Sequence, residues 1–118
     1  MIQSEWIKPG THLSCMGADM PVKQEIDEML TARASLFADD IEQVTTVGEC
    51  KIAYKKDMIT KEQITEIGKV IAGEHPGRKN EEEITIFDST GIAIQDLLTA
   101  DTAIKTGREK NIGLEIEL

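Results

Sequence analysis

The sequence predicts an α/β fold in which parallel strands alternate with helices. Strand-like and helix-like segments follow one another along the 118 residues, and the segments between strands are long enough to form crossovers. Hydrophobic residues make up 40% of the chain, which suffices for a core, and the length corresponds to one domain. The chain has no internal repeat or low-complexity tract. We therefore expect a single domain built on a parallel sheet.

The first half of the chain contains two predicted strands, each followed by a predicted helix. The strands are expected at residues 11–17 and 35–40, and the helices at residues 23–34 and 41–57. Ile26, Met29 and Leu30 recur at helical spacing in the first of these helices. Gly48 lowers the helix propensity in the middle of the second.

The second half has the strongest single helix pattern, at residues 59–73. Thr60 is its expected N-cap, Gln63 completes a capping box, and Gly73 ends the helix. After a charged loop, the remaining elements are a strand at 84–90, a helix at 91–111 and an edge strand at 112–118. The expected buried stripe of the last helix consists of Ile94, Leu97, Leu98 and Ile104.

Composition excludes several classes of function. The formal net charge of −9 argues against nucleic acid or an anionic membrane surface as a partner, since both require a basic patch. The apolar runs are too short for a transmembrane span, and the N-terminus has no signal-peptide pattern. Two cysteines form no disulfide framework, and two distant histidines disfavour a zinc site, so no metal is expected. We expect a soluble cytoplasmic protein.

Polar side chains follow two of the predicted strands. Asp19 and Lys23 come after the first strand, and Asp88, Ser89 and Thr90 directly follow the apolar run ITIF at 84–87. Ligands of open α/β sheets bind beyond the carboxyl ends of the strands, where a partly desolvated carboxylate can act as acid or base. Lys23 could hold an anionic or carbonyl group.

Structural interpretations of the same residues are also open. Asp19 could stabilise only a turn, because Asp-Met-Pro is good turn chemistry. Ser89 or Thr90 could cap the helix that begins at Gly91, and Lys23 could be a solvated surface charge. The chain also lacks G-x-G-x-x-G and G-x-x-x-x-G-K-[ST]. The chain therefore either is not a nucleotide-binding unit or lacks the first half of one.

Two segments resemble the ornithine cyclodeaminase/mu-crystallin family, which also includes archaeal-type alanine dehydrogenases and related imine reductases. They are KPGTHLSCMGADMPVKQEID and AGEHPGRKNEEEITIFDSTGIAIQDL. The resemblance extends from about Ser4 to Leu118. It implies that the chain corresponds to the C-terminal third of longer proteins. The implied fold is the second half of a Rossmann-type parallel sheet with flanking helices, plus a C-terminal helix and strand.

The resemblance also implies a domain organisation and partners. Residues 1–118 would form a single partial Rossmann-like domain, with about 92–118 returning toward the family's dimerisation region. The implied cofactor is NAD or NADP, and the implied substrate is a small amino acid. The family's phosphate loop and substrate-carboxylate residues would lie upstream. A homo-oligomer, or a complementary N-terminal chain, is the expected protein partner.

The resemblance assigns roles by position. Asp19 matches the family's catalytic acid/base, and Lys23 and Ser89 match cofactor contacts. Thr90 matches the approach to substrate, and Cys15, Met16, Gly17 and Ala18 match the strand end beside the nicotinamide. The family usually has glycine where this chain has Val22. A β-branched residue does not readily adopt positive φ, which bears on the loop around Asp19.

Three hypotheses follow from the resemblance. The first is an incomplete lyase or oxidoreductase of amino-acid metabolism, in which hydride transfer at an amino-acid Cα gives an imine, and which is inactive alone. The second is one subunit of a split cyclodeaminase or dehydrogenase, completed by another chain. The third is a non-catalytic relic that self-associates, because half a Rossmann sheet leaves an unpaired edge.

Overall fold

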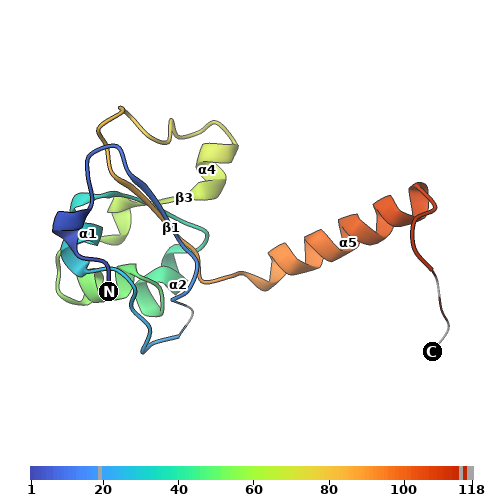
Figure 1. Cartoon of the computed structure of the whole chain (residues 1–118), viewed down its shortest axis with the longest axis horizontal. Coiled ribbons are helices and arrows are strands. Elements are labelled where there is room, and N and C mark those ends of the chain that lie inside the picture. The colour runs from blue at the N-terminus through green and yellow to red at the C-terminus, as the bar shows by residue number, and fades with distance from the viewer. Residues whose placement is uncertain (19, 115, 117–118) are drawn as a thin grey trace.

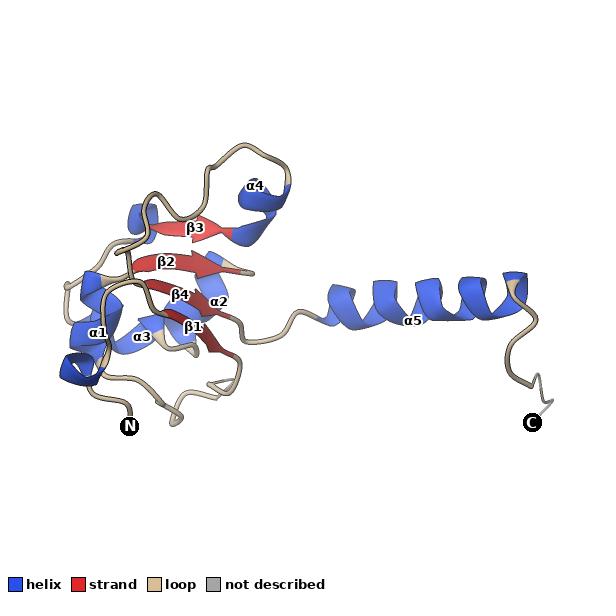
Figure 2. Cartoon of the chain, turned by 45° about the horizontal axis from the view of Figure 1, so that its top comes forward, coloured by secondary structure: helices blue, strands red, loops and turns tan. Residues whose placement is uncertain are grey.

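The protein is built on one sheet of four parallel strands. The computed structural model describes residues 1–18, 20–114 and 116. The strands follow the order β1-β4-β2-β3, and in Figure 2 all four point toward the end from which α5 emerges. Their bounds are β1 His12–Cys15, β2 Ser35–Ala38, β3 Ile64–Glu66 and β4 Thr85–Asp88. The α/β class is confirmed, and the last strand lies between β1 and β2.

Five α-helices and two 3-10 turns accompany the sheet (Figure 1). The helices are α1 Glu28–Arg33, α2 Ile41–Thr46, α3 Cys50–Lys55, α4 Ile67–Ile71 and α5 Ala93–Glu109. The 3-10 turns are η1 Ser4–Trp6 and η2 Lys61–Gln63. Side chains from α1, α2 and α3 form the core with one face of the sheet, and its central members are Leu30, Leu36, Val44, Ala53 and Ile86.

Two helices predicted in the first half differ from the observed ones. The segment 41–57 is not one helix, because the chain breaks between α2 and α3 at Gly48. A Cβ at Gly48 would lie 2.6 Å from Oδ2 of Asp88 and 2.8 Å from the Cα of Val44, so only glycine lets these elements meet. The segment 23–34 is helical only from Glu28, after Asp27 accepts hydrogen bonds from two first-turn N–H groups.

The prediction of one helix over 59–73 is wrong in its first half. The Thr60–Gln63 capping box is present, but it closes the short turn η2 rather than an α-helix. The chain then enters β3, in which Ile64 pairs with Leu36 of β2. Pairing with an existing sheet has overridden the helical periodicity. Gly73, with φ of 77°, follows α4 as expected for a helix stop.

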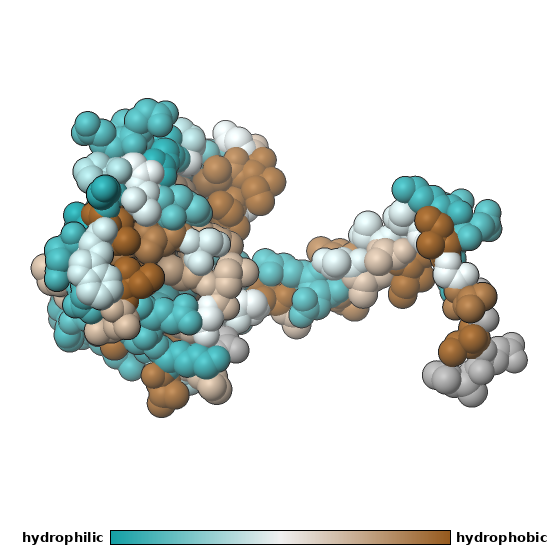
Figure 3. All heavy atoms as spheres, in the orientation of Figure 1, coloured by the Kyte–Doolittle hydropathy of each residue, from teal (hydrophilic) through white to brown (hydrophobic). Residues whose placement is uncertain are grey.

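The second face of the sheet is only partly covered. A groove of about 350 Å³ separates it from α4 and the following loop. Phe37 and Phe87 of the sheet line one side of the groove, and Ile67 and Val70 of α4 line the other. Figure 3 shows hydrophobic atoms gathered over α4, where Ile71 is 81% exposed. Parallel sheets are normally covered on both faces, so this face lacks part of its cover.

The helix α5 leaves the carboxyl end of the sheet and projects away from the body (Figures 1 and 2). It was correctly predicted as a helix, but its apolar stripe is not buried: Leu97 is 68% exposed and Ile104 is 56% exposed. The described residues after it, 112–114 and 116, do not form the expected edge strand. No helix in the described part of the chain is long and apolar enough to cross a membrane.

Candidate functional site

The carboxyl ends of β1 and β4 meet at one edge of the sheet. Cys15 and Asp88 are register partners, and the N–H of Ser89 donates to the carbonyl of Cys15 at 2.9 Å. The structure therefore brings together Cys15, Asp88 and Ser89, which are far apart in the sequence. Asp19, the predicted acid/base, lies outside the described residues, so its proposed role stays a prediction.

The segment after β1 presents a mixed surface. Cys15 is buried, and burial beside the carboxylates of Glu49 and Asp88 raises the pKa of its thiol to about 12. The thiol therefore stays protonated and is unsuited to nucleophilic attack. Met16 is 62% exposed at the edge, whereas Ala18 is fully buried. Met16 offers apolar surface to a ligand, whereas the carbonyl of Cys15 already accepts the N–H of Ser89.

The predicted cofactor contact Lys23 lies in a segment held by α3. Its backbone carbonyl accepts a hydrogen bond from Nζ of Lys51, and its side chain is half-buried. Val22 is 89% exposed, and among the described residues the non-glycine positions with positive φ are Asp57 and Asn111. The valine is therefore accommodated without the left-handed backbone that glycine would allow.

Ser89 is paired with a carboxylate that sequence reasoning missed. The serine is 3% exposed, and its hydroxyl donates to Oδ2 of Asp39 at 2.6 Å. Asp39 directly follows β2, so it stands at a strand end next to β4. The same rule that singled out Asp19 and Asp88 would have identified it. Thr90 is half-buried, and its hydroxyl donates to Oε1 of Gln43 at 2.6 Å.

Asp88 faces the helices rather than the edge of the sheet. Its Oδ2 accepts the backbone N–H of Cys50 at 2.9 Å, and its Oδ1 has no hydrogen-bond partner among the described residues. Burial raises the pKa of this carboxyl group, and the nearby charge of Asp39 raises it further. Asp88 therefore connects the end of β4 to the start of α3. No cluster of three or more potential metal ligands occurs among the described residues.

These residues suit one part of a dinucleotide site. Strand ends of a parallel sheet, exposed Met16 and the backbone around Cys15 can meet the face of a flat ring. A phosphate loop is not among the 118 residues, so the pyrophosphate would have no glycine-rich cradle here. The fit within the 118 residues is therefore to a flat ring and not to the pyrophosphate.

Comparison with known proteins identifies the family. The model of the ornithine cyclodeaminase/mu-crystallin family matches residues 1–111. The chain belongs to this family. The iminosuccinate reductase of Paracoccus denitrificans is 39% identical over 118 residues, and the alanine dehydrogenase of Archaeoglobus fulgidus is 43% identical. In each case the match covers 99% or more of this chain but 37% of the relative.

Solved structures of family members agree closely with the fold. The Paracoccus denitrificans iminosuccinate reductase, in complex with NAD+, superposes with a TM-score of 0.90 over all of this chain and 36% of that one. An archaeal alanine dehydrogenase dimer with bound NAD gives 0.87 at 43% identity, covering 37% of that chain. A Thermococcus litoralis Δ1-pyrroline-2-carboxylate reductase, with NADH and L-proline, gives 0.87 at 31% identity. This chain thus has the fold of about one third of these NAD-binding relatives.

Proposed function

We propose that the chain forms the nicotinamide side of an NAD(P)-dependent enzyme that acts at the Cα of an amino acid or its imine. On this proposal it is inactive alone, because the phosphate loop and the groups that hold the substrate carboxylate belong to a complementary chain. The proposal includes a reducing, cytoplasmic setting, which two free buried cysteines fit.

One observation supports the proposal most: Cys15 at the end of β1 meets Asp88 and Ser89 at the carboxyl edge of a parallel sheet. This edge is where open α/β folds bind their ligands. The relatives that share this fold along the whole chain include complexes with NAD+ and NADH. Their substrates, iminosuccinate, alanine and pyrroline-2-carboxylate, are amino acids or imines by name.

Each residue then has a proposed task. Bound NAD(P)+ would supply the hydride acceptor. Met16 would pack against the ring, Lys23 and Ser89 would hold the cofactor, and Asp19 would move the proton at the substrate nitrogen. Thr90 would lie on the side from which substrate approaches. The buried Cys15 would contribute backbone and volume, because its thiol stays protonated.

The exposed helix α5 supports the proposed partner. A 17-residue helix with no cover is marginal in water, since most helical stability in proteins comes from packing an apolar face. We propose that residues 92–118 pack against the dimerisation region of the complete assembly. An archaeal relative is a dimer. The second candidate function, a non-catalytic domain that self-associates, rests on the same exposed helix and on the partly covered sheet face.

The test is a titration with NADH, followed by nicotinamide fluorescence and by Trp6, which is 64% exposed. We expect no binding up to millimolar NADH by the isolated chain, and micromolar binding with imine reduction once a family N-terminal region is added. Binding and turnover by the isolated chain would show that it is complete. If the added region gave no complex and no binding, the enzyme proposal would be wrong.

A further inference from the structure

The start of α3 holds the loop that carries the candidate site residues. Glu49 is fully buried, and its carboxylate accepts the backbone N–H of Glu25 at 2.9 Å and that of Ile26 at 3.1 Å. Burying a carboxylate is costly unless it is hydrogen-bonded, and burial raises the pKa of Glu49. The buried carboxyl group of Glu49 is therefore satisfied by the backbone of this one segment.

Two neighbours extend the same attachment. Lys51 is 3% exposed, and its Nζ donates to the carbonyl of Lys23. Gln24 donates from Nε2 to the carbonyl of Ile26 at 2.8 Å and to that of Glu49 at 3.3 Å. Residues 23–26 are thus joined to the start of α3 by hydrogen bonds in both directions: Lys51 reaches the backbone of Lys23, and Gln24 reaches the backbone of Glu49.

The other end of the loop is closed as well. A Cβ at Gly17 would overlap the carboxylate of Glu25, so the glycine lets Glu25 fold against the end of β1. Ala18 is buried there, whereas Met20 and Val22 are exposed. The chain is therefore held both at Gly17 and at Glu25. Helix α1 has its own cap in Asp27, so Glu49 is not needed to start that helix.

We propose that Glu49 is a positioning residue, which holds residues 23–26 and thereby sets the place of Lys23. Lys51 assists by fixing the carbonyl of Lys23. The effect on cofactor rests on the proposed function, whereas the effect on the loop does not. Nothing in the sequence pattern singled out Glu49, because a glutamate is rarely buried.

The test compares Glu49→Gln with Glu66→Gln in the full chain, because Glu66 is an exposed glutamate on β3. Glutamine keeps the shape but has one acceptor oxygen and no charge. By NMR we expect amide exchange at Glu25 and Ile26 to rise about tenfold or more in Glu49→Gln, with an upfield shift of both amide protons. Exchange at Leu30, which follows the Asp27 cap, should stay within about twofold.

Lys51→Met provides a second variant in case Glu49→Gln does not fold. It keeps the buried aliphatic stem without the donor, and we expect faster tryptic cleavage after Lys23 at an unchanged melting temperature. Unchanged exchange at Glu25 and Ile26, or an equal rise throughout the core, would overturn the proposal.

The cofactor effect is measured separately, in the assembly that binds NADH. There, Glu49→Gln should weaken the binding of NADH by about tenfold relative to Glu66→Gln. The loss of affinity should be proportional to the fraction of molecules in which the loop is displaced. If no assembly binds NADH, the proposed function fails, while the exchange experiment still decides the role of Glu49. If NADH binds both variants equally although the loop is released, Glu49 has no role in cofactor binding.

Discussion

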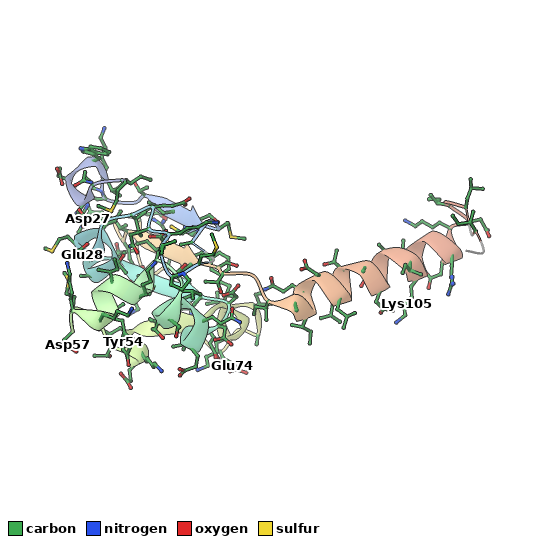
Figure 4. The ribbon with its side chains drawn as sticks, turned by 90° about the horizontal axis from the view of Figure 1, so that it is seen from below. Asp27, Glu28, Tyr54, Asp57, Glu74 and Lys105 are labelled. Carbon is green, nitrogen blue, oxygen red and sulfur yellow. The ribbon has the colours of Figure 1, made fainter. Side chains whose placement is uncertain are left out.

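Helix α1, which belongs to the body formed by the sheet and α1 to α4, and helix α5 both have apolar residues at helical spacing. Packing against the sheet buries such a residue in α1, whereas those of α5 are exposed. In α1, Leu30 is completely buried against the sheet. In α5, Leu97 recurs at the same helical spacing but is 68% exposed. Figure 4 shows the labelled Lys105 on α5 standing clear of the body that contains Asp27 and Tyr54. The comparison teaches that α5 is patterned for a surface that the other described residues do not supply.

The largest expected effect comes from deleting one leucine in each region. Leu30→Ala should lower the free energy of unfolding by roughly 2–5 kcal/mol, because it leaves a cavity in the core. Leu97→Ala should change it by no more than about 0.5 kcal/mol, because nothing covers that side chain. Urea unfolding followed by circular dichroism measures both. Equal losses would mean that α5 is buried in solution, by the body or by a second copy.

A smaller effect is expected from adding one methyl group to two glycines. Gly48→Ala should destabilise the body by about 1–3 kcal/mol, because its Cβ would overlap Asp88 and the backbone of Val44. Gly68→Ala is the matched control, with no atom within 4 Å of the new Cβ, and should stabilise α4 by about 0.5–1 kcal/mol. Thermal unfolding of the two variants checks the sign. A neutral Gly48→Ala would contradict the close packing of β4 and α3.

The smallest effect is a pH dependence that belongs to the body alone. Because the folded pKa of Asp88 is raised from 3.8, the folded state binds a proton that the unfolded state has released. This contribution to stability is present below about pH 4 and is lost as the pH rises through the folded pKa. Asp88→Asn should therefore gain stability relative to the wild type between pH 4 and 8.

The control for this pH dependence is Asp96→Asn on α5, where the side chain is exposed. Because α5 stands clear of the body, this variant should leave the free energy of unfolding of the body as in the wild type, as measured by urea unfolding in matched buffers. A difference between Asp88→Asn and the wild type that does not change with pH would show that Asp88 titrates alike in both states.

Local patterns predicted the elements that depend on local chemistry. The strands β1 and β4 were predicted, although each ends two residues earlier than expected, at Cys15 and Asp88. The helix stop at Gly73 was predicted as well, because caps leave a signature in a few residues. The strand β3 could not be predicted from its sequence, because the extended conformation of Ile64 depends on pairing with β2. The sequence showed that Gly48 lowers the helix propensity, but only the position of Asp88 explains why the helix breaks there.

The candidate site was also predicted only in part. The residues at the ends of β1 and β4 were identified by the rule of strand ends and by family resemblance, and the structure places Cys15 beside Asp88 and Ser89. Asp39 follows the same rule but was passed over. Glu49 could not be found at all, because its importance lies in which distant backbone groups it binds. A supporting residue of this kind is visible only once the chain is folded.

The exposed stripe of α5 has a consequence for the abundance of the protein in a cell. In the proposed assembly, a copy that has not met its partner would display Ile94, Leu97 and Leu98 on a helix that stands apart from the core. Chaperones and proteases recognise such exposed apolar segments, and partly open chains are continuously sorted by them. Copies without a partner would be degraded, whereas copies in the assembly would not. The helix would thereby match the amount of this chain to the amount of its partner.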